Sequence, residues 1–122
     1  VMLARAIVSE TDILILDEPT SALDMKNQSL ILDWMRTLNK TRGLTIIFTT
    51  HLPQHAATIA DDALLMFNDQ SYRHGKAGDI LSEENLFKLY GLPFKKVSVV
   101  CEDEEIVSLV PVFRISKNGV PR

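Results

Sequence analysis

Two short apolar runs, each followed directly by polar side chains, constrain the fold of this chain most strongly. Residues 13–16 (ILIL) run into Asp17 and Glu18, and residues 44–48 (LTIIF) run into residues 49–51 (TTH). An unbroken apolar run such as residues 13–16 is typical of a strand that is covered on both faces in a parallel sheet, and the β-branched and aromatic run 44–48 predicts a second buried strand. Ligands of such sheets bind beyond the carboxyl ends of the strands. Both polar groups are therefore candidates for chemistry.

The segments that connect these runs have helix signals. Residues 25–42 form the first predicted helix, with Asp24 as its N-cap and Gly43 as its C-terminal stop. Pro53 is well placed as the first residue of a second helix that reaches about residue 60. Apolar residues recur at helical spacing in the first helix and predict its buried stripe. They are Leu30, Ile31, Trp34, Met35 and Leu38.

The rest of the chain also contains predicted strands and helices. Residues 63–67 predict a third strand, with residues 72–77 returning as its hairpin partner, and Ser82 caps a short helix that Gly91 and Pro93 end. Two later strands, residues 97–100 and 106–113, are separated by the acidic turn 102–105. Residues 1–9 read as helical, and residues 116–122 as frayed. Strands that alternate with helices predict an α/β fold with crossover helices and a parallel sheet.

Composition excludes several function classes. The 122 residues carry a net charge of −3, which gives no footprint for nucleic acid or an anionic membrane surface. No apolar run approaches the roughly 20 residues of a membrane span. The single cysteine, Cys101, fits a reducing compartment, and we expect it to be a buried small hydrophobe. The chain starts at Val1 within an apparent helix, and we interpret this start as a truncation.

Asp17 and Glu18 can be interpreted either as catalytic groups or as solvated acids without a chemical role. A carboxylate at a strand end can hold Mg²⁺, usually through water, and a second can orient or deprotonate an attacking water. Alternatively, the strand ends in two solvated acids. The continuation after the pair decides between them, because residues 16–24 read LDEPTSALD.

Residues 16–24 closely resemble the Walker B motif and D-loop of the nucleotide-binding domains of ABC transporters. Residues 49–51 resemble their switch-histidine segment, and residues 1–7 look like the helix after the family's signature motif. The resemblance covers residues 1–92, and residues 93–122 are expected to form a small C-terminal β extension. It implies the core of a P-loop NTPase of the ABC type, here partial.

The resemblance implies a role for each matching position. Asp17 would hold the water shell of Mg²⁺, and Glu18 would be the general base or the water-positioning group. His51 would contact the γ-phosphate of ATP. The D-loop would reach across a dimer of such domains, and it comprises Ser21, Ala22, Leu23 and Asp24. Asp24 can also serve as the helix cap, and His51 alone would read as a hydrogen-bonded loop histidine.

Other polar residues have no motif support. His55 and His74 are read as surface residues, and residues 102–105 as a solvated turn rather than a metal site. No Gly-x-x-x-x-Gly-Lys-Ser/Thr run occurs, nor a Leu-Ser-Gly-Gly-Gln signature, so the amides and lysine that cradle phosphates are missing. A glutamine loop is also absent. The family places all three motifs before this segment, and we expect the chain alone to be inactive as an ATPase.

Two further stretches narrow the resemblance. Residues 50–56 (THLPQHA) and 78–86 (GDILSEENL), with Tyr90 and Gly91, resemble importer ATPases for ferric siderophores, haem, cobalamin and related metal chelates. This implies ATP and Mg²⁺ as cofactors and a peripheral place on the cytoplasmic face of the membrane. The implied partners are a second ATPase subunit, transmembrane permease subunits and, indirectly, a substrate-binding protein, with no nucleic acid.

Two alternatives stay open. A soluble ABC ATPase of DNA repair or translation would share the same core, although such proteins usually carry long insertions or tandem cassettes, and none follows His51. A binding or regulatory module without enzymatic activity is the third reading. An unpaired sheet edge argues against it.

Overall fold

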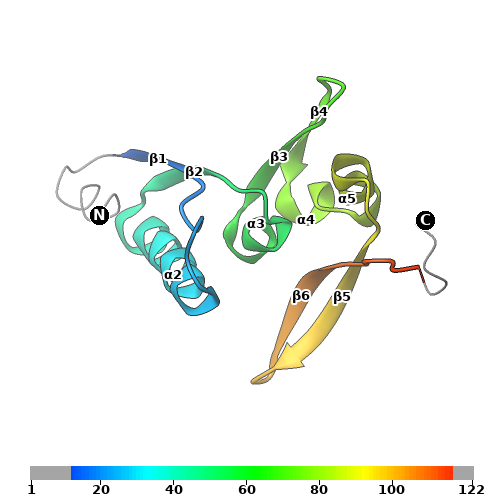
Figure 1. Cartoon of the computed structure of the whole chain (residues 1–122). Coiled ribbons are helices and arrows are strands. Elements are labelled where there is room, and N and C mark those ends of the chain that lie inside the picture. The colour runs from blue at the N-terminus through cyan, green and yellow to red at the C-terminus, as the bar shows by residue number, and fades with distance from the viewer. Residues whose placement is uncertain (1–11, 117–122) are drawn as a thin grey trace. The chain divides into compact units, whose positions relative to one another are not determined.

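The structure is a computed structural model that describes residues 12–116 (Figure 1). The expectations for residues 1–9 and 117–122 lie outside the described residues. The elements follow one another in this order: β1 (Ile13–Asp17), α2 (Met25–Arg42), β2 (Thr45–Thr49), α3 (Pro53–Ile59), β3 (Asp62–Met66), β4 (Tyr72–Lys76), α4 (Ala77–Ile80), α5 (Glu83–Tyr90), β5 (Phe94–Cys101) and β6 (Glu104–Pro111).

The chain divides into two compact units, residues 1–55 and residues 56–122, with the boundary inside α3. Each unit is described by itself below. The boundary predicted near residue 92 separates the ATPase core (residues 1–92) from its C-terminal β extension (residues 93–122), and it stays a prediction.

The first unit contains a parallel strand pair and its crossover helix. β1 and β2 pair in parallel with Ile13 opposite Thr45 and Asp17 opposite Thr49. The helix α2 connects them and packs against β2. Its buried side chains, together with one from β1 and the residue before β2, form the apolar interior of this unit. They are Leu16, Leu32, Met35, Leu38 and Leu44. The predicted strand–helix–strand order is confirmed.

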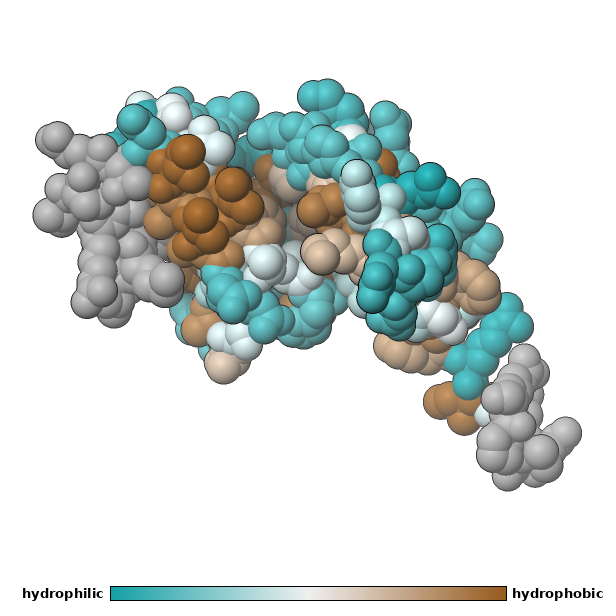
Figure 2. Space-filling view, turned by 90° about the horizontal axis from the view of Figure 1, so that it is seen from above, coloured by the Kyte–Doolittle hydropathy of each residue, from teal (hydrophilic) through white to brown (hydrophobic). Residues whose placement is uncertain are grey.

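The predicted burial on both faces of this sheet is wrong for the described structure. Ile13, Ile15 and Ile47 alternate along the two strands on one face, and they are 54 %, 69 % and 55 % exposed. Hydrophobic residues gather on the surface over β1 and β2 (Figure 2). Successive side chains of a strand point to opposite faces, so packing on α2 buries only one set.

The predicted stripe on α2 is partly wrong for the same reason. Met35 and Leu38 are buried, and Leu32 joins them, whereas Leu30 and Trp34 are each 49 % exposed. Periodicity predicted an apolar face, but the packing partner decides which edge of that face is covered.

Both ends of α2 are as predicted. The Asp24 carboxylate accepts a hydrogen bond from the Asn27 N–H at 2.9 Å, and Asp24 itself is extended. Gly43 has φ +64°, a left-handed conformation that glycine adopts without steric cost, and its N–H donates to the Asn39 carbonyl. The capping contacts of Asp24 and Gly43 therefore determine where α2 begins, shortly after the acidic end of β1, and where it ends.

The second unit is built around the β3–β4 hairpin. β3 pairs with β4 in antiparallel fashion, as predicted, and the described residues do not add it to the parallel pair. The helix α4, which the sequence did not predict, follows at once, and Ser82 caps α5 by accepting from the Asn85 N–H at 3.1 Å. The buried core of this unit comprises Leu65, Phe67, Ala77, Leu81, Leu86, Phe94 and Leu109.

The C-terminal strands form a two-stranded antiparallel hairpin. Its turn residues Glu102 and Asp103 both have positive φ, 52° and 65°, which is the backbone of a tight two-residue hairpin turn. The acidic turn predicted over residues 102–105 is confirmed but is shorter, because Glu104 and Glu105 already belong to β6. The predicted burial of Cys101 is wrong, because this residue lies at the end of β5 beside the turn and is exposed.

Candidate functional site

The candidate site lies where β1 and β2 end side by side. Parallel pairing in register places Asp17 opposite Thr49, so the residues that follow each strand emerge at one edge. The first unit contains all of the predicted site residues. The two polar groups, which the sequence analysis placed at strand ends, therefore lie at one edge of this strand pair.

Glu18 and His51 contact each other directly. His51 Nδ1 lies 2.6 Å from Glu18 Oε1, and the two side chains are 67 % and 46 % exposed. The contact joins the two residues for which the sequence predicted catalytic roles, although the roles themselves stay predictions. A carboxylate on one imidazole nitrogen fixes the tautomer and the ring orientation.

A threonine hydroxyl connects the two acidic residues. Thr49 Oγ1 donates to Asp17 Oδ1 at 2.6 Å and accepts a hydrogen bond from the Glu18 backbone N–H at 3.0 Å. Glu18 has φ +44°, in the left-handed region that non-glycine residues rarely adopt. Sequence reasoning did not single out this role of Thr49. The parallel pairing of two strand ends was the available signal.

The predicted D-loop residues form a tight loop between β1 and α2. The Ser21 N–H donates to the Glu18 carbonyl at 3.1 Å, and the Leu23 N–H to the Thr20 carbonyl at 3.3 Å. Ala22 has φ +65°, and Gln28 on α2 donates to the Leu23 carbonyl at 3.1 Å. Ser21, Ala22 and Asp24 are exposed, so the loop presents them to solvent.

A second polar contact lies behind this loop. Thr20 is only 4 % exposed, and its hydroxyl lies 3.1 Å from His55 Nδ1. Burial, and next the nearby His51, lower the pKa of His55. The interpretation of His55 as a surface residue is therefore wrong, because the first turn of α3 turns this ring toward the loop. His74 is exposed, as predicted.

Divalent metal would find oxygen ligands at this edge. Mg²⁺ is bound through one or two carboxylates together with nucleotide phosphates and water, and Asp17 and Glu18 supply such carboxylates. Within residues 12–116, no group of three or more histidine, cysteine, aspartate or glutamate side chains is arranged to hold a metal ion. Asp17 and Glu18 are the carboxylates of this edge that could contribute oxygen ligands.

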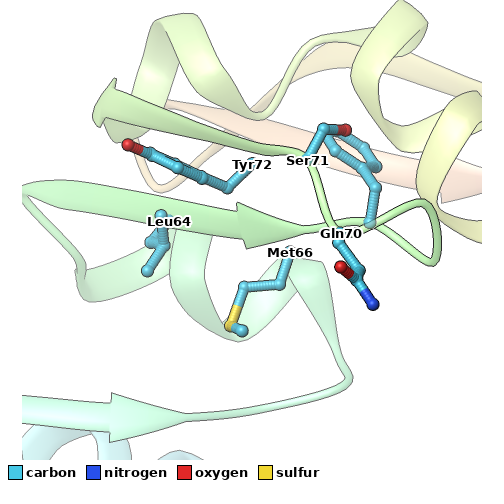
Figure 3. Close-up of a pocket in the computed structure, with 6 residues that line it drawn as sticks. Leu64, Met66, Gln70, Ser71 and Tyr72 are labelled. Carbon is cyan, nitrogen blue, oxygen red and sulfur yellow. The ribbon is translucent and has the colours of Figure 1, made fainter.

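A separate hollow lies on the β3–β4 hairpin of the second unit. Its volume is about 210 Å³, and its walls are mainly apolar, with Leu64 and Met66 of β3 on one side and Tyr72 of β4 beside them (Figure 3). Gln70 and Ser71 of the turn close its end. It contains no acid, base or nucleophile of the predicted site.

No helix among the described residues has the length and apolar character to cross a membrane.

Residues 1–54 match an AAA domain family, whose description also mentions an AbiEii toxin and a type IV toxin–antitoxin system. This match supports an ATPase-type core for the first unit.

Relatives extend the likeness over nearly the whole chain. The molybdate import ATP-binding protein MolC of Haemophilus influenzae is 37 % identical over 114 residues, which are 93 % of this chain and 45 % of the relative. An ATP-binding protein of Helicobacter pylori named for iron chelatin transport is 32 % identical over 97 residues, 80 % of this chain and 38 % of the relative.

A solved structure agrees with these relatives. A chain from a structure described as a metal-chelate type ABC transporter in an inward-facing conformation superimposes with a TM-score of 0.87 at 37 % identity, over 92 % of this chain and 44 % of that chain. The chain thus spans less than half the length of the relatives it matches. The predicted α/β fold of ABC ATPases is confirmed, and the chain is a homologue of the ATP-binding subunits of ABC transporters.

Proposed function

We propose that this chain is the part of an ABC importer's ATP-binding subunit that carries the water-activating side of the ATPase site. The contact between Glu18 and His51 at 2.6 Å carries this proposal. A carboxylate at a strand end, held by a histidine that follows the neighbouring strand, is suited to polarise a water molecule for attack on a phosphate.

Each residue of the edge has a distinct part in this proposal. Glu18 accepts the hydrogen bond of His51 on Oε1, and its second carboxylate oxygen orients or deprotonates the attacking water. His51 contacts the γ-phosphate. Asp17 holds the water shell of Mg²⁺, which would neutralise charge on the β- and γ-phosphates when bound.

The remaining parts of the proposal concern assembly. The exposed Ser21, Ala22 and Asp24, with the half-buried Leu23, would face a second copy of the subunit, with ATP between the two. An importer function implies permease subunits and a substrate-binding protein as partners. It also implies a peripheral location on the cytoplasmic face of the membrane. Names of relatives that refer to molybdate, iron chelatin and a metal chelate support a metal-containing substrate.

The proposal is tested on the complete subunit that contains this chain. We expect Glu18→Gln to lower steady-state phosphate release by at least about 100-fold while Mg-ATP still binds, because glutamine keeps the shape and removes the negative charge. The variant is then expected to accumulate as an ATP-bound dimer in size-exclusion chromatography. Asp17→Asn is expected to weaken Mg²⁺-dependent nucleotide binding itself.

A structural role for Glu18 makes a different prediction. If this carboxylate were only a solvated strand-end acid, the substitution would change stability by less than about 0.5 kcal/mol and leave the rate intact. Phosphate release by Glu18→Gln at the parent rate would therefore remove Glu18 as the water-activating group.

A further inference from the structure

We propose that Thr49 is a positioning residue that holds both acids of the site with one hydroxyl group. This inference rests on the proposed function, since it assigns Thr49 a task in the arrangement of Asp17 and Glu18. It concerns a residue that touches neither nucleotide nor water in the proposed reaction.

Both hydrogen bonds of the Thr49 hydroxyl go to the acidic strand end. The hydroxyl has one proton, and it gives that proton to Asp17 Oδ1 at 2.6 Å. It accepts the Glu18 N–H at 3.0 Å on a lone pair. The direction of the first bond is therefore fixed, and a bond to a carboxylate is stronger than one between neutral groups.

The second bond acts on the backbone of Glu18. This residue has φ +44°, which an L-residue adopts only when its surroundings hold it there. In this conformation the Glu18 carboxylate reaches His51 Nδ1 at 2.6 Å. The Thr49 hydroxyl thus secures the backbone turn that brings the proposed water-activating carboxylate to its histidine.

The neighbouring threonines show that the arrangement is particular to Thr49. Thr50 turns its hydroxyl to the Leu52 N–H at 3.0 Å, at the start of α3. Thr45 lies on the same face of β2 as Thr49 but pairs with Ile13, four residues before the acids. Thr45→Val is therefore a matched control, because it makes the same chemical change in the same strand away from the site.

Three variants of the complete subunit test the proposal. Thr49→Val removes the hydroxyl at nearly constant shape, Thr49→Ser keeps the hydroxyl, and Thr45→Val is the control. We expect Thr49→Val to lower kcat for Mg-ATP by about 10-fold or more with KM changed by less than about 3-fold, because small misplacements of reacting groups reduce rate more than binding. Thr49→Ser and Thr45→Val are expected to stay within about 3-fold of the parent in both constants.

A second readout does not depend on activity. Amide hydrogen exchange of Glu18, measured by NMR without nucleotide, is expected to accelerate about 10-fold or more in Thr49→Val, since its N–H loses its acceptor. The exchange of Glu18 in Thr49→Ser and Thr45→Val is expected to match the parent. Thr49→Ala, which removes the hydroxyl without adding a methyl group, replaces Thr49→Val if that variant melts at a much lower temperature.

The outcomes separate this inference from the proposed function. A parent subunit that releases no phosphate contradicts the proposed function. An active parent whose Thr49→Val variant keeps its kcat, or whose Thr49→Ser variant loses as much, contradicts the positioning role. Unchanged exchange of Glu18 in Thr49→Val overturns the geometric basis of the inference, whatever the rates.

Discussion

At the scale of single residues, the strand ends gather polar contacts that depend on side-chain identity. Glu18 reaches His51, Asp17 reaches Thr49, and Thr20 reaches His55, all between Asp17 and His55. The motif resemblance singled out Glu18 and His51, but it did not predict that they contact each other. The other two contacts required the register of the strands and the first turn of α3, which no local pattern encodes.

His55 predicts a pH dependence of stability. Burial, followed by the nearby His51, lowers the pKa of His55 in the folded protein. Below the ordinary histidine pKa of about 6.5, the unfolded chain therefore binds a proton more readily than the folded chain. Stability contributed by neutral His55 is complete above about 6.5 and is lost as the pH falls below it toward the lowered pKa.

The measurement is the thermal midpoint of the complete subunit between about pH 7.5 and pH 5.5. We expect His55→Gln to reduce the fall of the midpoint on acidification. His74→Gln, at an exposed position of β4, is the matched control and is expected to follow the parent. Parallel curves for the parent and His55→Gln would show that His55 does not contribute.

At the scale of elements, Asp24 serves two roles that variants can separate. Its carboxylate caps α2 by accepting the Asn27 N–H, and the same residue ends the exposed loop that we propose to face a second subunit. Asp24→Asn keeps a good cap, whereas Asp24→Ala removes it and is expected to cost about 1 kcal/mol of unfolding free energy.

Denaturant unfolding and phosphate release together separate the two roles. We expect Asp24→Asn to unfold within a few tenths of a kcal/mol of the parent. Its ATPase rate then reports on the loop alone. If Asp24→Asn and Asp24→Ala lose equal activity at different stabilities, the charge matters to the loop; if both keep the parent rate, Asp24 is only a cap. Ser82→Ala, which removes the corresponding cap of α5, is the control for loss of stability without an effect on the loop.

Element ends were predictable because their chemistry is local. Asp24, Gly43, Ser82 and Gly91 each act on backbone groups within a few residues, and each lies where the sequence placed it. Burial was less predictable, because it depends on partners distant in the chain. Trp34 and Cys101 were expected to be buried and are exposed. The face of a strand or helix is buried only where a second layer packs against it.

At the scale of the whole molecule, the uncovered face of the β1–β2 sheet and the length of the relatives lead to the same expectation. Ile13, Ile15 and Ile47 expose apolar surface, and contiguous exposed apolar patches usually mark interfaces. The relatives are more than twice as long as this chain. We expect residues of the complete subunit that lie outside this chain to cover the face.

Ile15→Lys tests this expectation, because Ile15 is 69 % exposed in this chain. In the complete subunit, a buried lysine without a partner would lower the free energy of unfolding by at least about 2 kcal/mol. In the isolated 122-residue chain, the same substitution should leave stability unchanged and reduce self-association, since it removes apolar surface from solvent. Ser29→Lys, on the exposed side of α2, is the control and should change neither. Equal, small effects of Ile15→Lys in both proteins would mean that the face stays open to water in the complete subunit.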